Sequence, residues 1–162
     1  MCLNSQGDAK HRKDLYSLLQ KTWKFNPGAE FYFMPPPSFL TSNDPRIHRH
    51  GKNQPPVPLY LAQGNLFMYL PPVGFTDQGP RTVIEAHACG LSAICDSRTG
   101  GPTDRITSDT GWLINTIDDL HPILREITEN PGILKEKGEA ARERAKTMFV
   151  KERWVELLKG DA

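Results

Sequence analysis

The chain has 162 residues, of which 38% are hydrophobic and 24% are charged, an ordinary composition for one globular domain. Its 20 Lys and Arg against 19 Asp and Glu leave a net charge of +1, which excludes a surface that attracts nucleic acid or acidic lipid as a whole. No apolar run predicts a membrane span or the core of a signal peptide. We therefore expect one domain over 1–162 in the cytoplasm, either free or peripheral to a membrane.

The cysteines Cys2, Cys89 and Cys95 are odd in number and show no C-x-x-C spacing. Both features argue against a disulfide framework and against a zinc site, and we expect no metal. Cys89 and Cys95 stand among small apolar residues, which is typical of buried, unreactive thiols.

The first third of the chain predicts a helix, a strand and then a long loop. Leucines at helical spacing predict a helix over 13–23, which the sequence N-P-G at 26–28 would end. The aromatic run 30–34 predicts a strand. Prolines then crowd the segment 35–58, which we expect to be an irregular loop.

This loop contains three adjacent basic residues, His48, Arg49 and His50. A metal or phosphate site is one interpretation of them. A solvated basic cluster is the interpretation that we favour, because charge runs in proline-rich loops are usually exposed.

The rest of the chain alternates between short apolar runs and helical patterns. Strands are expected at 66–70, 91–95 and 111–114, with loops at 71–80 and 97–102, a helix over 81–89 that Gly90 ends, and C-terminal helices over 118–160. Asp118 or Asp119 would cap the first of these helices, and the last would cover 150–159. Strands that alternate with helices predict an α/β fold, a single Rossmann-like domain with a parallel sheet.

Ligands bind outside the carboxyl ends of the strands in such sheets, so the loop 71–80 is the first candidate site. Gly79 would allow an anion to approach the backbone, and Pro80 suits the start of a helix. The first N–H groups of that helix and the Arg81 guanidinium would then attract a phosphate. A strand–glycine–helix junction that serves packing alone is the alternative.

Two carboxylates, Asp77 and Glu85, stand eight positions apart and flank this anion site. Glu85 would be half-buried about one turn into the helix, where a carboxylate needs hydrogen-bond partners. The hydroxyls of a ribose could supply them, and backbone N–H groups are the alternative.

Four stretches of the second half read D-Q-G-P-R-T-V-I-E, E-A-H-A-C-G-L-S-A-I, G-G-P-T-D and S-D-T-G-W-L-I. In this order they resemble E-x7-E, E-A-M-A-C-G-x-P-V, G-G-x-P-E and D-G-x-T-G-x-L of the retaining family four of GT-B glycosyltransferases. The resemblance covers 77–154, corresponds to the C-terminal, donor-binding half of the GT-B fold, and includes Phe149 and Trp154 in the tail.

The resemblance implies a role for individual residues. Glu85 corresponds to the glutamate that grips the ribose, and Asp77 to the catalytic-site glutamate that faces the donor sugar. Lys13 corresponds to a lysine that neutralises the diphosphate, so that no metal or other cofactor is needed. The intervening donor-binding positions are Gln78, Gly79, Pro80, Arg81 and Thr82. Gly100, Gly101 and Asp104 correspond to a motif that shapes a loop and caps a helix.

Some positions depart from the family pattern. Asp77 is one methylene shorter than glutamate, and a glycine of the motif is Pro80. His87 replaces a methionine, which we interpret as a packing residue. The arginine expected six positions before Lys13 is Gly7, so that one of the arginines 46, 49 or 81 is a candidate for its role.

The expected function is that of a glycosyltransferase, or its donor-binding domain, which transfers a hexosyl group from a nucleoside diphosphate sugar to a glycan or lipid-linked acceptor. The resemblance implies that the N-terminal half is missing, so that the isolated chain would need that half, a partner chain or a second copy of itself to act. The alternatives are a non-catalytic nucleotide-sugar binding module that needs a partner chain, and a nucleotide-sugar epimerase. None of these functions involves nucleic acid.

Overall fold

The computed structural model describes residues 2–4 and 15–148. These residues form one sheet of six strands in the order β3-β2-β1-β4-β5-β6, and all neighbouring strands are parallel. The strands are β1 (Cys2–Asn4), β2 (Phe31–Met34), β3 (Ile47–Arg49), β4 (Leu66–Tyr69), β5 (Ser92–Asp96) and β6 (Gly111–Ile114). The expected α/β, Rossmann-like architecture with a parallel sheet is therefore confirmed.

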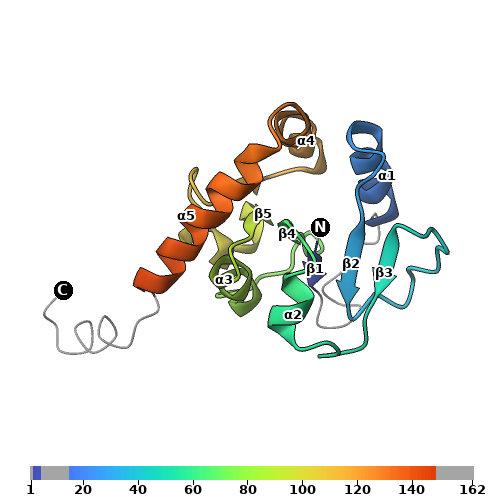
Figure 1. The fold of residues 1–162 in the computed structure, drawn as a ribbon, viewed down its shortest axis with the longest axis horizontal. Coiled ribbons are helices and arrows are strands. Elements are labelled where there is room, and N and C mark those ends of the chain that lie inside the picture. The colour runs from blue at the N-terminus through green and yellow to red at the C-terminus, as the bar shows by residue number, and fades with distance from the viewer. Residues whose placement is uncertain (1, 5–14, 149–162) are drawn as a thin grey trace, which may run out of the picture.

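Helices cover both faces of the sheet (Figure 1). They are α1 (Leu15–Phe25), α2 (Val57–Leu61), α3 (Arg81–Ala88), α4 (Leu120–Glu129) and α5 (Gly132–Met148). One buried cluster joins α1 and α4 to the sheet, and a second joins α2 and α3 to the opposite face. The helix α5 packs along β5, β6 and α3.

The side chains of β4 show how one short strand contributes to both cores. Leu66 and Met68 point into the α1–α4 cluster, whereas Phe67 and Tyr69 point into the α2–α3 cluster. Successive side chains of a strand face opposite sides of a sheet, and all four are buried. A continuous apolar run is therefore the correct signal for a strand that is covered on both faces.

The segment 35–58 is not the irregular loop that its prolines predict, because it contains β3 and the start of α2. The sequence pattern does not predict β3 because it is an edge strand of three residues, of which only Ile47 is buried. The crossover from β2 to β3 contains no helix, and its Leu40 packs into the α1–α4 cluster instead. β1 was also not predicted from the sequence.

The other predicted elements lie close to their observed places. α1 begins at Leu15 and α3 ends before Gly90, which has a φ of +82°. The loop expected over 97–102 contains two short 3-10 helices, η2 (Ser97–Thr99) and η3 (Gly101–Asp104). The helix expected over 150–159, like Phe149 and Trp154, lies outside the described residues.

A third 3-10 helix, η4 (Ile117–Asp119), precedes α4. Asp119 stands at the start of α4 as expected, but its carboxylate accepts hydrogen bonds from the N–H groups of Asn115 and Thr116 ahead of η4. These bonds hold the pKa of Asp119 below its usual value.

Cys95 is buried as expected, whereas Cys89 is half-buried. Both thiols are free, and burial raises the pKa of each. Within 2–4 and 15–148, no helix is long and apolar enough to cross a membrane.

Candidate functional site

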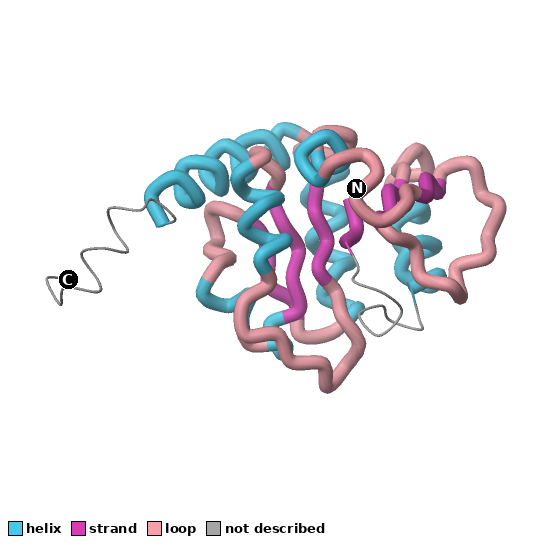
Figure 2. The backbone as a smooth tube through the Cα atoms, turned by 90° about the horizontal axis from the view of Figure 1, so that it is seen from below, coloured by secondary structure: helices cyan, strands magenta, loops and turns pink. Residues whose placement is uncertain are grey.

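The strand order places a topological switch point between β1 and β4. From β1 the chain proceeds to β2 and β3 on one side, and from β4 to β5 and β6 on the other. Ligands of open parallel sheets bind outside the carboxyl ends of the strands at such a point. In Figure 1 the arrow of β2 points to the bottom of the view, and Figure 2 shows the molecule from that side. The loop that follows β4 is the segment 70–80, so the predicted site residues 77–82 lie at the switch point.

Both oxygens of the Asp77 carboxylate accept a hydrogen bond. The Tyr69 hydroxyl donates to its Oδ2 at 2.6 Å, and the Gly79 N–H donates to its Oδ1 at 3.1 Å. Burial, followed by the hydrogen bond to Asp77, raises the pKa of Tyr69 above its usual value, so the hydroxyl remains a donor. Sequence analysis did not identify Tyr69, because it reads as one more apolar residue of a buried strand.

The backbone of Asp77 is clamped by the loop that follows β5. The Asp77 N–H donates to the Thr99 carbonyl at 3.0 Å, and the Gly101 N–H donates to the Asp77 carbonyl at 2.8 Å. Gly101 has no room for a side chain, since a Cβ there would lie 2.3 Å from the Asp77 carbonyl oxygen. The structure thus gives Gly100 and Gly101 the expected loop-shaping role, whereas Asp104 ends η3 and does not cap a helix.

The start of α3 is polar and accessible. Pro80 is buried and occupies the N-cap position with no side-chain hydrogen bond to the helix. Gln78 is exposed, Thr82 is half-buried, and the side chain of Arg81 is 84% exposed. The first turn of α3 therefore presents N–H groups and a guanidinium beside Asp77, an arrangement that suits an anion.

Glu85 lies one turn into α3 with its side chain 38% exposed, as expected. Among the described residues no backbone N–H group donates to it, and its Oε1 lies 3.8 Å from Arg81 Nε. An exposed ion pair at this distance contributes little to stability. Glu85 and Arg81 can therefore separate to meet a ligand at low cost.

A further arginine that the sequence analysis missed lies behind this loop. A Cβ built at Gly79 would lie 2.9 Å from Arg105 Nη2, so the absence of a side chain at position 79 leaves the space that the guanidinium fills. Arg105 adds positive charge beside the 77–80 backbone. No local pattern could have revealed it, because the two residues are 26 positions apart.

Three arginines are candidates for the role of the family arginine that Gly7 replaces, and they lie in different parts of the fold. Arg46 pairs with Asp44 at 2.6 Å and stacks on Trp23 at 3.8 Å. Arg49 donates to the carbonyls of the preceding crossover, and both arginines belong to the β3 edge of the sheet. Arg46 and Arg49 thus contact protein groups at the β3 edge, whereas Arg81 lies at the switch point. Lys13 lies outside the described residues.

Three histidines of the described residues contact neighbouring side chains. His87 is 4% exposed, and burial next to Arg144 lowers its pKa to about 4, which confirms it as a packing residue. His48 and His50 stack on Tyr32 with ring centroids 4.5 Å and 6.3 Å away, and both are half-buried, so their rings have packing partners as well as contact with solvent. In the described part of the chain, no three His, Cys, Asp or Glu side chains are grouped to hold a metal.

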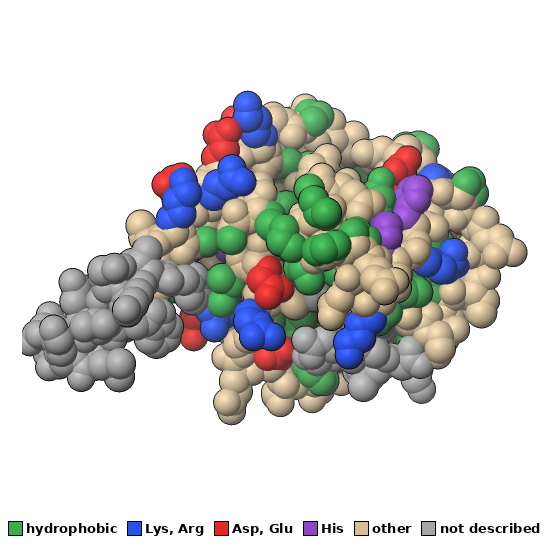
Figure 3. Space-filling view, turned by 60° about the horizontal axis from the view of Figure 1, so that its bottom comes forward, with side chains coloured by type: hydrophobic (Ala, Val, Ile, Leu, Met, Phe, Trp, Pro, Cys, Tyr) green, Lys and Arg blue, Asp and Glu red, His purple; other side chains and the backbone are tan. Residues whose placement is uncertain are grey.

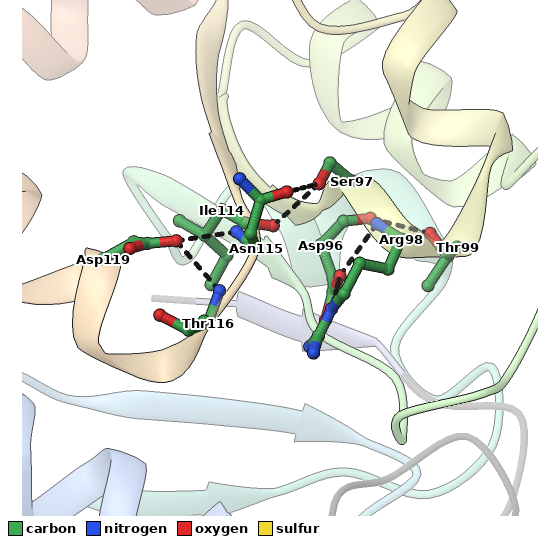
Figure 4. Close-up of polar contacts among 8 residues, drawn as sticks. All are labelled: Asp96, Ser97, Arg98, Thr99, Ile114, Asn115, Thr116 and Asp119. Carbon is green, nitrogen blue, oxygen red and sulfur yellow. Dashed lines mark hydrogen bonds and ion pairs between the residues drawn. The ribbon is translucent and has the colours of Figure 1, made fainter.

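A polar network ties the carboxyl ends of β5 and β6 next to the site (Figure 4). Asp96, with 2% of its side chain exposed, accepts hydrogen bonds from the backbone N–H and the guanidinium of Arg98. Ser97 Oγ donates to the Ile114 carbonyl at 3.2 Å and also contacts the Asn115 side chain. This network braces the loop that clamps Asp77.

No protein-family model matches the chain, and no curated protein matches it in sequence. Solved structures do match. TarM from S. aureus superposes with a TM-score of 0.76 at 16% identity, over 98% of this chain and 34% of TarM. HepE from Anabaena, solved with UDP-glucose, gives 0.72 at 14% identity, over 98% of this chain and 48% of HepE.

The C-terminal domain of a group 1 glycosyl transferase, LpcC from Francisella tularensis, gives a TM-score of 0.68 at 12% identity, over 93% of this chain and 86% of that domain. At these identities the likeness concerns the fold. The chain has the fold of the C-terminal, Rossmann-like half of GT-B proteins, and it spans about a third to a half of the longer neighbours.

Proposed function

We propose that the chain is the donor-binding half of a glycosyltransferase of the retaining family four type. It would transfer a hexosyl group from a nucleoside diphosphate sugar to a glycan or lipid-linked acceptor. The observation that carries the proposal is the position of the segment 77–85 directly after β4 at the switch point, in a fold shared with the neighbours. HepE has been solved with UDP-glucose, and the pneumococcal O-GlcNAc transferase GtfA with UDP and GlcNAc.

Each part of the donor has a proposed place. The diphosphate would lie against the first turn of α3 and the guanidinium of Arg81, with Gln78 and Thr82 beside it. Glu85 would exchange its long contact with Arg81 for the ribose hydroxyls. Asp77 would face the hexose. The structures named above include no epimerase, and the transfer function is favoured over the two alternatives.

The chemistry would stabilise a departing nucleoside diphosphate. Negative charge grows on the diphosphate as the glycosidic bond breaks, and fixed donors placed there lower the barrier. Backbone N–H groups, Arg81 and Lys13 would supply this stabilisation without a metal. The charge of Arg105 behind the loop adds to the same field.

The acceptor would be held by a second domain that faces the carboxyl ends of the strands. Figure 3 shows hydrophobic side chains gathered in the middle of this side of the molecule. The loop after β4 and the helix α2 carry the exposed apolar residues Val73 and Leu59, 68% and 62% exposed. Exposed apolar surface of this kind suits contact with another domain. The missing half, a partner chain or a second copy could provide it, and the isolated chain would bind donor without turnover.

The proposal is tested by calorimetric titration of UDP, GDP and ADP, each with and without Mg²⁺, into the full chain. We expect one nucleotide to bind equally with and without metal, and Glu85→Ala to weaken it at least tenfold. Glu139→Ala is the matched control, because Glu139 forms an exposed pair with Lys135 at the same 3.8 Å and the same spacing on α5. If none of the nucleotides binds to the unmodified chain, the proposed donor site is wrong.

A further inference from the structure

The last residue of β4, Tyr69, connects the hydrophobic core to the candidate donor loop. Its ring belongs to the α2–α3 cluster and the residue is only 4% exposed. Its hydroxyl stands at the carboxyl end of the strand and donates to Asp77 Oδ2 at 2.6 Å. An O–H···O⁻ distance in this range is typical of a strong, charge-assisted hydrogen bond. A hydroxyl of the packed core, that of Tyr69, is therefore bonded to the Asp77 carboxylate, which we place beside the donor sugar.

The two kinds of contact at Asp77 fix different things. Its backbone bonds with Thr99 and Gly101 determine where the residue lies. Its side-chain bonds with Tyr69 and Gly79 determine which way the carboxylate turns. Bonds to both oxygens of a carboxylate fix the plane in which it lies.

We propose that Tyr69 is a positioning residue of the donor site, whose hydroxyl orients the Asp77 carboxylate toward the hexose of a nucleoside diphosphate sugar. The inference rests on the proposed function. It also explains how an aspartate can serve where the resembling family has the longer glutamate: the shorter side chain is held by a hydroxyl that the core keeps in place. Small misplacements of a group that touches the reacting sugar are costly, so such a support has a purpose.

A matched control is present in the same core. Tyr60 is 1% exposed, and its hydroxyl donates to the Tyr32 carbonyl at 2.7 Å. Tyr60→Phe thus removes a buried tyrosine hydroxyl bond of similar length, but one that ties α2 to β2 rather than β4 to Asp77. Comparison of Tyr69→Phe with Tyr60→Phe separates the positioning role from a general loss of stability.

The experiment measures binding of matched pairs, UDP and UDP-glucose, GDP and GDP-mannose, ADP and ADP-glucose, to the full chain and both variants. We expect Tyr69→Phe to bind the nucleotide sugar about tenfold more weakly, while binding of the bare nucleotide changes less than twofold. Tyr60→Phe should leave both values unchanged. Equal weakening of nucleotide and nucleotide sugar by Tyr69→Phe would indicate a structural role and overturn the inference.

A readout without ligand separates the two proposals. Hydrogen exchange at the Gly79 amide, which is bonded to Asp77, should accelerate about tenfold or more in Tyr69→Phe and stay unchanged in Tyr60→Phe. Unchanged exchange in Tyr69→Phe overturns the inference whether or not nucleotides bind. If neither nucleotides nor nucleotide sugars bind to the unmodified chain, the proposed function is wrong, and so is the role of Tyr69 toward the hexose. Faster hydrogen exchange in Tyr69→Phe would then show only that Tyr69 orders the loop.

Discussion

The same three-residue arrangement occurs in two regions of the molecule. Asp44 and Arg46 precede β3, whereas Asp96 is the last residue of β5 and Arg98 follows it. In each pair the aspartate Oδ1 accepts from the backbone N–H and the Nε of the arginine two residues on, and its Oδ2 accepts from Nη2. The local chemistry is identical, yet the Asp44 side chain is 20% exposed and that of Asp96 is 2% exposed.

The difference teaches that place in the fold, not local sequence, decides what such a motif does. At the β3 edge, Arg46 of the Asp44–Arg46 pair lies over the Trp23 ring and so holds the end of the crossover against α1. At the end of β5 it anchors the loop whose Thr99 and Gly101 clamp Asp77. The donor-loop region is therefore held by buried contacts, whereas the β3 edge is held by accessible ones, and the following changes test that contrast.

The largest effect is expected at the clamp itself. Gly101→Val would force a side chain into the Asp77 carbonyl, which lies 2.3 Å from the Cβ position. We expect a loss of about 3 kcal/mol in the free energy of unfolding and loss of nucleotide binding. Chemical denaturation and calorimetry measure the two. Gly28→Ala is the control, because its nearest neighbour lies 3.7 Å from the Cβ position. Retained binding in Gly101→Val would show that the clamp is dispensable.

The paired aspartates give the second test. Asp96→Ala leaves the Arg98 guanidinium without its buried partner, and we expect a loss of about 2–3 kcal/mol in the free energy of unfolding. Asp44→Ala removes the same set of bonds at the accessible edge and should cost clearly less. Urea denaturation of both variants measures the difference. Equal losses would contradict the claim that burial separates the two motifs.

The last test concerns pH and His87, a residue of α3 that is buried next to Arg144 of α5. Burial lowers its pKa from 6.5 to about 4, so the unfolded chain binds a proton between these pH values and the folded chain does not. Stability should therefore fall as the pH drops from about 6.5 to about 4, by about 3 kcal/mol from this group. His87→Met should flatten the curve of Tm against pH in that window. The exposed His121→Met should leave the curve as it is, and an unchanged curve in His87→Met would contradict the prediction.

Local sequence predicted much of the donor-loop half. β4 and β5 are predicted because their continuous apolar runs reflect burial on both faces of the sheet. β6 is predicted from its apolar run although Leu113 is exposed, and α3 from its helical spacing. β3 was missed because three residues at a sheet edge with one buried side chain leave no such pattern. The segment 77–85 was found because all of its members are neighbours along the chain.

The sequence by itself determined the α/β class and the position of the candidate site after a buried strand, because these depend on the order of apolar runs, glycines and charges. Only the tertiary structure decided how Asp77 is held. Two separate parts of the chain approach it or its loop: the end of β4 with Tyr69, and the segment 99–105 with Thr99, Gly101 and Arg105. Contacts between distant segments depend on how the sheet and its loops pack, and no pattern of neighbouring residues encodes them.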